Sequence, residues 1–297
     1  MVILTGMGVA MIQTDLAFGA AKDTRSVGYI EVLHGSLDAF SIERQGKAFP
    51  PALLLPIQAG DRVHVRGGGN LLTLRCGSKA VKVTTEESPY VIPVSAAPPG
   101  FVARLGDVLI ALAARLQQQQ AKAAATVSLS GRGEEITLTM PLLDEQRSKL
   151  RSDVTRVFLA WRGGTPPYRV RLTSLTTDAD LARVEALEEP RVGLQLIMTP
   201  MPIGTIEVDV QDGAGGRASS SIEIVPSNGV PVIPKSLSDQ DMPAELKRVL
   251  AADWLSRQNR REWGFQAYQL AAQDASSFEP ARLLRDCLEE LQDCYKR

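Results

Sequence analysis

Runs in which apolar and polar residues alternate one by one fill two separate parts of the chain. In residues 27–93 these runs are short, and glycine turns separate them. In residues 154–225 the alternation is again regular, with Val157, Leu159 and Trp161 on the same parity. A period of two is typical of antiparallel strands that have one buried and one solvated face. The pattern therefore predicts two β modules, with Trp161 in the core of the second.

Two other parts of the chain have the period of amphipathic helices. Residues 98–125 place their apolar side chains on one helical face, and we expect this helix to be a connector that packs on one or both β modules. The apolar positions are Leu105, Val108, Leu109, Leu112 and Leu116. Residues 243–293 carry three shorter apolar stripes, which predict two or three helices that form a small cap or docking element.

The predicted boundaries follow from proline-rich stretches and from the N-terminal segment. An apolar stretch followed by small residues is typical of a secretory signal peptide, although no Lys or Arg precedes Lys22, and the same segment fits a buried strand or helix. The fold class that follows is mainly β with helical additions, and residues 136–143 predict a further strand. The predicted parts are a signal peptide at 1–21, a β domain at 22–97, a helical connector at 98–125, a β-sandwich at 126–230 and a helical C-terminal segment at 231–297.

Charge and hydropathy narrow the classes of function. The chain has 33 Lys and Arg against 34 Asp and Glu, so that its formal net charge is −1. This balance gives no support to nucleic-acid binding, which usually needs a strongly basic face. We expect no nucleic-acid partner. No run of apolar residues reaches the length of about 18 that a transmembrane helix requires, so we expect no transmembrane segment.

The three cysteines give no sign of a disulfide framework or of a zinc site. Cys76, Cys287 and Cys294 contain no CxxC pair. Cys287 and Cys294 lie on one expected helix with their α-carbons about 10 Å apart, beyond the disulfide limit of about 7 Å. The sequence therefore predicts small, buried, reduced cysteines.

No catalytic constellation stands out in the sequence. His34 and His64 each lie on a predicted strand, away from cysteine or a second histidine, so we expect no metal site. Acidic pairs such as Glu86 and Glu87 are typical of solvated loops. We expect no cofactor and no enzymatic activity. A carboxylate-dependent hydrolase is an alternative, because its two carboxylates need only be close in space.

A family resemblance covers about 70 residues of the first β part. The segment GYIEVLHGSLDAF, followed by LLLPIQAGDRVHVRGGGNLLTLRCGSKAVKVTTEESPYVIP, resembles a FecR-type domain. The shared features are a glycine-bounded first hairpin, a strand that follows Gly-Asp, and two strands joined by a glycine turn. The resemblance implies a β domain of the bacterial periplasm, often in iron-uptake signalling. We expect this chain to lack the cytoplasmic N-terminal domain and the transmembrane helix of the signalling type, which argues against a sigma-regulator role.

A second resemblance lies in residues 154–225. The patterns W-x-G-G-x-x-P-Y-x-V, which begins at Trp161, and V-x-D-x-x-G, which begins at Val210, are similar to bacterial Ig-like repeats of exported proteins. The resemblance implies an Ig-like β-sandwich, here without the cysteine pair of the antibody type. Such domains place and bind other molecules.

Three arginines form the predicted contact surface. Arg162, Arg169 and Arg171 have the outward parity on strands that we expect to pair as a hairpin, with Arg156 in phase with Arg162. Guanidinium groups bind carboxylate or phosphate groups on a partner. A solvated sheet face balanced by nearby acids is the alternative.

The function predicted from the sequence is that of a non-enzymatic binding or scaffolding protein of the bacterial cell envelope. We expect it to be periplasmic or exported and to bind an envelope protein. The alternatives are a periplasmic sensor or regulator module in FecR-type signalling, and the hydrolase named above.

Overall fold

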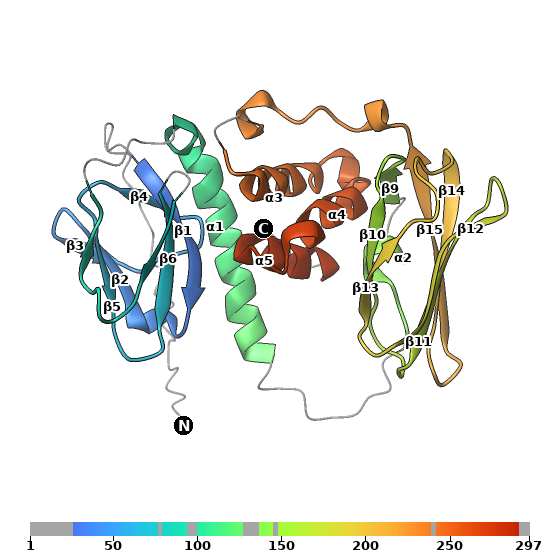
Figure 1. Ribbon diagram of the computed structural model, residues 1–297, viewed down its shortest axis with the longest axis horizontal. Coiled ribbons are helices and arrows are strands. Elements are labelled where there is room, and N and C mark those ends of the chain that lie inside the picture. The colour runs from blue at the N-terminus through green and yellow to red at the C-terminus, as the bar shows by residue number, and fades with distance from the viewer. Residues whose placement is uncertain are drawn as a thin grey trace, which may run out of the picture.

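A computed structural model of the chain shows a β module, a layer of helices and a second β module side by side (Figure 1). It describes residues 26–76, 79–93, 100–126, 137–144, 148–238 and 242–290. The structure confirms the mainly β fold class with helical additions. The predicted signal peptide at 1–21 lies outside the described residues.

The first β module spans residues 26–92 and contains two antiparallel sheets. Its strands are β1 (Ser26–His34), β2 (Phe40–Arg44), β3 (Lys47–Phe49), β4 (Pro56–Gln58), β5 (Arg62–Val65), β6 (Leu71–Cys76), β7 (Lys79–Val83) and β8 (Tyr90–Val91), with a 3₁₀ turn η1 (Leu37–Ala39). One sheet has the strand order β4-β1-β6-β7 and the other β3-β2-β5-β8. The alternation seen in the sequence buries Val63 and Val65 on one side of β5, while Arg62 is exposed. The predicted strands of this module are confirmed.

A buried carboxylate holds the loops of the first module together. Asp61 is 1% exposed and accepts two hydrogen bonds from the Arg44 guanidinium, with Nε–Oδ1 at 2.9 Å and a terminal nitrogen–Oδ2 at 2.7 Å. It also accepts a bond from the Gln58 backbone N–H at 2.8 Å. The same guanidinium donates to the Pro56 carbonyl. A buried charge needs such a paired and hydrogen-bonded setting, so the role of Asp61 is structural.

Helix α1 (Gly100–Thr126) follows the first module and packs on it. The predicted apolar stripe is buried, including Leu105, Leu109, Leu112 and Leu116. The helix contacts β1, β4 and the C-terminal helix α5 (Glu279–Glu289). The predicted helix is therefore confirmed, and it packs on the first β module.

The second β module spans residues 148–225. Its strands are β9 (Ser148–Arg151), β10 (Arg156–Ala160), β11 (Tyr168–Ser174), β12 (Ala179–Leu187), β13 (Arg191–Gln195), β14 (Gly204–Gln211) and β15 (Arg217–Val225). Five of them form a sheet of order β12-β11-β14-β15-β9, and β10 pairs with β13 in a separate sheet. Trp161 is 3% exposed and packs edge-to-face on Tyr168 at 5.2 Å between ring centroids. The prediction that Trp161 belongs to the core is confirmed.

The C-terminal helices lie between the two modules (Figure 1). They are α3 (Ala244–Leu255), α4 (Gly264–Asp274) and α5, with 3₁₀ turns η2 (Ser227–Gly229), η3 (Lys235–Leu237) and η4 (Asn259–Arg261) before or among them. Helix α5 contacts α1 and β1, whereas α4 contacts β9 and β10. The predicted helices at the C-terminal end are confirmed, and they form a central layer rather than a cap at one end.

Two buried glutamines attach α4 to the second module. The side-chain amide of Gln269 accepts a hydrogen bond from the Phe158 N–H at 2.7 Å and donates one to the Phe158 carbonyl at 2.9 Å. Gln266 accepts from the Arg151 N–H at 3.1 Å. Strands β10 and β9 are edge strands, and unpaired edges are a liability in β proteins. Helix α4 therefore supplies hydrogen-bond partners to backbone groups on the edges of two strands.

Ion pairs join helices within the helical layer and attach the layer to the second module. Asp253 on α3 is 1% exposed, and its two carboxylate oxygens accept hydrogen bonds from one terminal nitrogen of Arg115 on α1, at 2.7 and 2.8 Å. It also pairs with Arg257. Burial raises the pKa of Asp253, and the two guanidinium groups oppose that rise. Lys149 on β9 contacts Glu262 at 2.8 Å.

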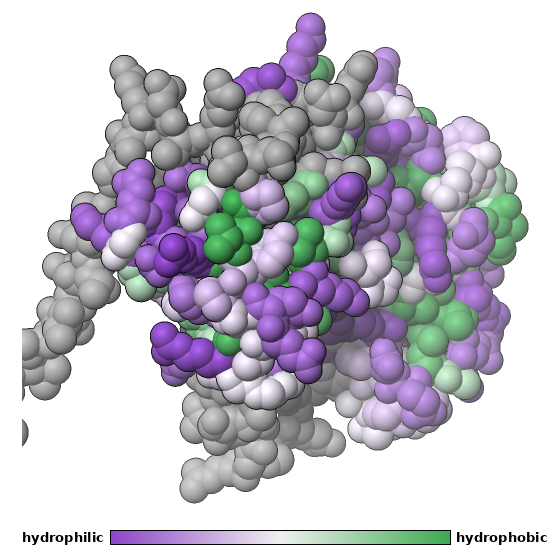
Figure 2. Space-filling view, turned by 60° about the vertical axis from the view of Figure 1, so that its left-hand side comes forward, coloured by the Kyte–Doolittle hydropathy of each residue, from purple (hydrophilic) through white to green (hydrophobic). Residues whose placement is uncertain are grey.

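Seen from the side of the first module, hydrophobic residues form separate small patches among hydrophilic ones (Figure 2).

Two local predictions are wrong. The strand expected at 136–143 is reduced to an isolated bridge between Thr139 and Arg162, followed by a short helix α2 (Pro141–Asp144), because the Met140 N–H bonds the Asp144 carboxylate instead of a strand. Cys287 is disulfide-bonded, against the expectation of reduced cysteines. That expectation assumed one helix over the seven-residue spacing, and α5 ends at Glu289. Cys294 lies outside the described residues, and Cys76 is free.

Candidate functional site

Four arginines lie on the outer face of the five-stranded sheet of the second module. Arg169 and Arg171 are on β11, Arg183 is on β12 and Arg217 is on β15. In the sheet register Arg171 lies opposite Arg183 on one side and Asp209 on the other, and both Arg169 and Arg217 lie opposite Gln211. We call these four residues the arginine face. Strand pairing therefore brings Arg169 and Arg171, two of the predicted contact residues, together with two further arginines.

Acidic side chains balance most of the arginine face. Arg171 contacts Asp180 at 2.7 Å, Arg183 contacts Glu185 at 2.6 Å, and Arg217 forms a bidentate pair with Asp209. The hydrogen bond from Arg171 lowers the pKa of Asp180. Among the described residues Arg169 has no ion pair, and its side chain is exposed.

The surface between these side chains is hollowed only slightly. A shallow depression of about 230 Å³ lies between the arginines, with Val170 and Gln211 also in its lining. Ligand pockets for small molecules have volumes of about 300–1,000 Å³. The shape of the arginine face fits a flat protein contact better than a small ligand.

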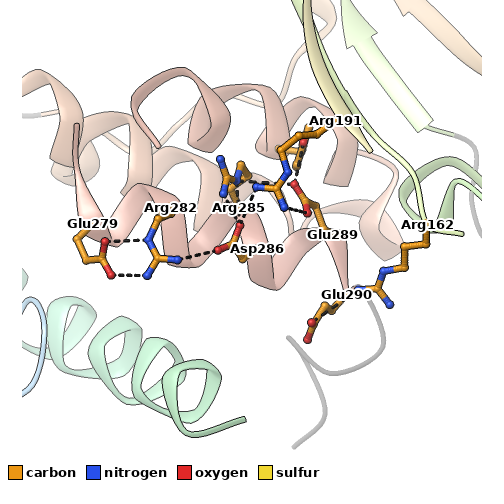
Figure 3. A network of polar contacts seen from close by, with 9 residues as sticks. Arg162, Arg191, Glu279, Arg282, Arg285, Asp286, Glu289 and Glu290 are labelled. Atoms are coloured by element: carbon orange, nitrogen blue, oxygen red, sulfur yellow. Dashed lines mark hydrogen bonds and ion pairs between the residues drawn. The ribbon is translucent and has the colours of Figure 1, made fainter. Parts of the chain in front are cut away.

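Arg162 is not part of the arginine face, which corrects the predicted stripe. It precedes β11 but bridges to Thr139, and its guanidinium lies 3.7 Å from Glu290 beside α5 (Figure 3). Strands β10 and β11 belong to different sheets and do not form the expected hairpin. The Gly163–Gly164 turn carries the chain from one layer to the other, so equal parity no longer means a shared face.

Arg162 instead borders an ion-pair network between the second module and α5 (Figure 3). Arg191 on β13 contacts Glu289 at 3.3 Å and Asp286 at 3.7 Å. The Tyr268 hydroxyl donates to Glu289 at 3.0 Å. Burial raises the pKa of Glu289, while Arg191 and the hydrogen bond from Tyr268 oppose the rise. The network joins the second module to α5, and its charged side chains are paired with each other.

Sequence reasoning missed Arg183 and Arg217. Arg183 lies in β12, a strand in which the alternation is interrupted, because Leu181 and Ala182 are both buried and the pairing with β11 changes register. Arg217 begins the strand after the Asp212–Gly216 turn, and its outward parity was visible in the sequence. What the sequence did not show is which strands lie side by side.

The other candidates for chemistry stay dispersed. His34 is exposed, and His64 lies 3.4 Å from Glu43 on the neighbouring strand. No group of three or more potential metal ligands occurs within the residues that the structure describes. Glu87 accepts hydrogen bonds from Thr84 in its own loop, and these bonds lower its pKa. Over the same part of the chain, none of the helices combines the length and apolar character needed to span a bilayer.

Comparison with known proteins finds no matching family model and no matching curated protein. Among solved structures the chain is similar to the Arg-specific cysteine proteinase gingipain R, with 6% identity and a TM-score of 0.23 over 26% of this chain and 17% of that one. It is also similar to CopC from Methylosinus trichosporium OB3b, with 13% identity and a TM-score of 0.22 over 28% of this chain and 88% of that one. These likenesses are too distant to carry an argument about fold or function.

Proposed function

We propose that this protein is a non-enzymatic binding or scaffolding protein of the bacterial cell envelope, and that it contacts a protein partner through the arginine face. The observation that carries the proposal is the convergence of four arginines from three strands on one flat, exposed sheet face. Guanidinium groups are suited to carboxylates on a partner. Because Arg169 has no ion pair with a described residue, its guanidinium can bind a partner without breaking an existing contact.

The helical layer supports the scaffolding part of the proposal. Ion pairs connect α1 to α3 through Arg115 and Asp253, β9 to Glu262, and β13 to α5 through Arg191 and Glu289. The Asp253 carboxylate is buried, and removal of the partner of a buried charge is costly. Two β modules held in a fixed relation present their outer faces at a constant separation, which is what a scaffold requires.

Two observations support an extracytoplasmic place. Cys287 is disulfide-bonded, and disulfides persist mainly in oxidising compartments such as the periplasm. The resemblance of the first part to FecR-type domains points to the same compartment. The two-sheet, largely antiparallel arrangement of the second module is compatible with the β-sandwich that its resemblance to Ig-like domains implies.

Charge reversal tests the proposed contact. The variant Arg169→Glu/Arg171→Glu and the control variant Arg62→Glu/Arg66→Glu, which reverses two exposed arginines of the first module, are used to capture partners from envelope fractions. We expect the arginine-face variant to lose a partner that the native protein and the control retain. Added salt should weaken the native capture, because charged contacts on an exposed face are screened.

The identity of the lost protein separates the two binding roles. A structural envelope component favours the scaffold, whereas a membrane-bound signalling protein favours the sensor predicted as the alternative. If both variants capture the same proteins as the native chain, the arginine face is solvated surface and the proposal is wrong.

A further inference from the structure

A cleft lies between the second module and helix α4, beside the contacts that join them and on the side opposite to the arginine face. One part, of about 450 Å³, lies between the start of β10 and α4, and a second part, of about 310 Å³, continues toward β13 and α5. Arg156, Phe158 and Gln273 line both parts. Each volume lies in the range of known ligand sites, and the two parts together form an elongated groove with Arg156 at their junction.

Arg156 is the cation of this groove that is left without an acidic partner among the described residues. Its side chain is exposed, lies 5.3 Å from the centre of the Phe158 ring, and donates to the Gly193 carbonyl at 3.3 Å. The other basic side chains of the lining are paired, for example Arg151 with Asp153 and Arg191 with Glu289. The groove therefore has one guanidinium without an acidic partner among the described residues, and this positive charge favours a negatively charged group on a ligand.

Gly193 holds Arg156 in this position. A Cβ atom added to Gly193 would lie 2.8 Å from the Arg156 Nε and 2.9 Å from the Phe158 ring. Contacts that short require both side chains to move. A glycine inside a strand often marks a place where another group approaches closely, and here it lets the guanidinium and the ring lie across β13. The contact with the Phe158 ring and the hydrogen bond to the Gly193 carbonyl orient the exposed Arg156 side chain.

The remaining lining suits a peptide. Gln273 is exposed and forms no hydrogen bond with a described residue, while Gln195 donates to the Thr155 carbonyl and keeps its amide oxygen as an acceptor. In the same groove Gln269 already pairs with both the N–H and the carbonyl of Phe158, which shows how a glutamine amide binds a peptide unit there. Phe158 and Leu270 add half-buried apolar surface.

We propose that the groove between β10 and α4 binds an extended segment of a partner protein that places an Asp or Glu side chain on Arg156. The guanidinium pairs with the carboxylate, the amides of Gln195 and Gln273 bind the backbone on either side, and Phe158 contacts a neighbouring apolar side chain. A nucleic acid or a sulfated glycan would need several free cations, and this groove offers one. The site is independent of the arginine face and lies on the opposite side of the second module.

Selection from a peptide library tests the proposal. A display library of random 12-residue peptides is selected in parallel on the full chain, on Arg156→Gln and on Arg169→Gln. We expect peptides selected on the full chain and on Arg169→Gln to share one acidic position next to an apolar residue, and that position to be absent from peptides selected on Arg156→Gln. Loss of a charged hydrogen-bonded pair should weaken binding of an enriched peptide by about 10-fold or more, measured by fluorescence anisotropy.

Two further variants separate charge from geometry. Arg156→Lys keeps the charge without the planar fork and should bind the enriched peptide more weakly than the native chain but more tightly than Arg156→Gln. Gly193→Ala keeps Arg156 but displaces it, and it should also weaken binding. Melting curves verify that each variant is folded.

The proposal is overturned if no acidic position is enriched, or if Arg156→Gln binds the enriched peptide as tightly as the native chain does. It is also overturned if Arg169→Gln loses the peptide equally, because the site would then be the arginine face. Tight binding of heparin that depends on Arg156, without peptide enrichment, would assign the groove to a glycan instead.

Discussion

The two β modules place their charged side chains in opposite ways. In the first module the Asp61 carboxylate is buried and is held by Arg44, so that a charge pair closes the loops from inside. In the second module an aromatic pair, Trp161 and Tyr168, lies inside, and the arginines lie on the outer sheet face. The pair of buried Asp61 with Arg44 in the first module stabilises its fold, whereas the arginine face of the second module lies on the surface.

The helical layer also contacts the two modules in different ways. It covers the β4-β1-β6-β7 sheet of the first module through α1 and α5. On the second module it satisfies strand edges through Gln266 and Gln269 and leaves the outer face of the five-stranded sheet open. A binding surface is therefore expected on the second module, and the variants below test whether the two modules depend on charge as differently as their structures indicate.

The largest effect is expected from removal of the aromatic core of the second module. Trp161→Ala should lower the free energy of unfolding by about 3–5 kcal/mol, because a large side chain that is 3% exposed leaves a cavity. Trp161→Phe should cost much less, since the buried indole N–H has no hydrogen-bond partner among the described residues. Denaturant unfolding measures both, and equal losses for the two variants would show that ring packing is not what holds this module.

The corresponding change in the first module removes its internal charge. Asp61→Ala should cost about 3 kcal/mol, because it leaves the Arg44 guanidinium and the Gln58 N–H without their acceptor. Hydrogen exchange should increase mainly in β2, β4 and β5, while β11 and β14 stay protected. Asp61→Asn, which keeps acceptor capacity, is the milder control. An unchanged stability of Asp61→Ala would mean that the first module does not need its buried pair.

The same contrast explains which features were visible in the sequence. Alternation identified the buried parity correctly in both modules, as at Val63 and Trp161, because parity is a local property of a strand. It did not show that the chain changes layer at Gly163–Gly164, since strand pairing depends on contacts distant in sequence. Arg162 was therefore assigned to the wrong face, while Arg169 and Arg171 were assigned together correctly.

The edge contact of α4 is expected to give an intermediate effect. Gln269→Ala removes both hydrogen-bond partners of Phe158 on the β10 edge and should cost about 1–3 kcal/mol. Gln273→Ala, one turn further along the same helix and without a bond to a described residue, is the matched control and should leave stability unchanged. If both substitutions have the same effect, helix propensity and not the edge contact is responsible.

Acid should produce a smaller effect at the start of the second module. Hydrogen bonds from Arg151 lower the pKa of Asp153 from 3.8 to about 2. A lowered folded-state pKa means that the pair adds stability above pH 3.8 and loses it as the pH falls toward 2. The Asp153 side chain is 39% exposed, so solvent screening limits this contribution to less than about 1 kcal/mol. Asp153→Asn should remove that part of the acid dependence, and an identical acid profile for both proteins would exclude it.

The smallest effect on stability is expected on the arginine face. The Arg171 side chain is 54% exposed, and its pair with Asp180 lies in solvent, where such pairs contribute little. Arg171→Ala should leave the midpoint of unfolding unchanged within the precision of the measurement. The proposed binding role predicts that the same substitution nevertheless slows association with a captured partner, most clearly at low salt. If Arg171→Ala instead loses stability and keeps its association rate, the arginine face has a structural role like that of Asp61. The two modules would then not differ in how they use charge.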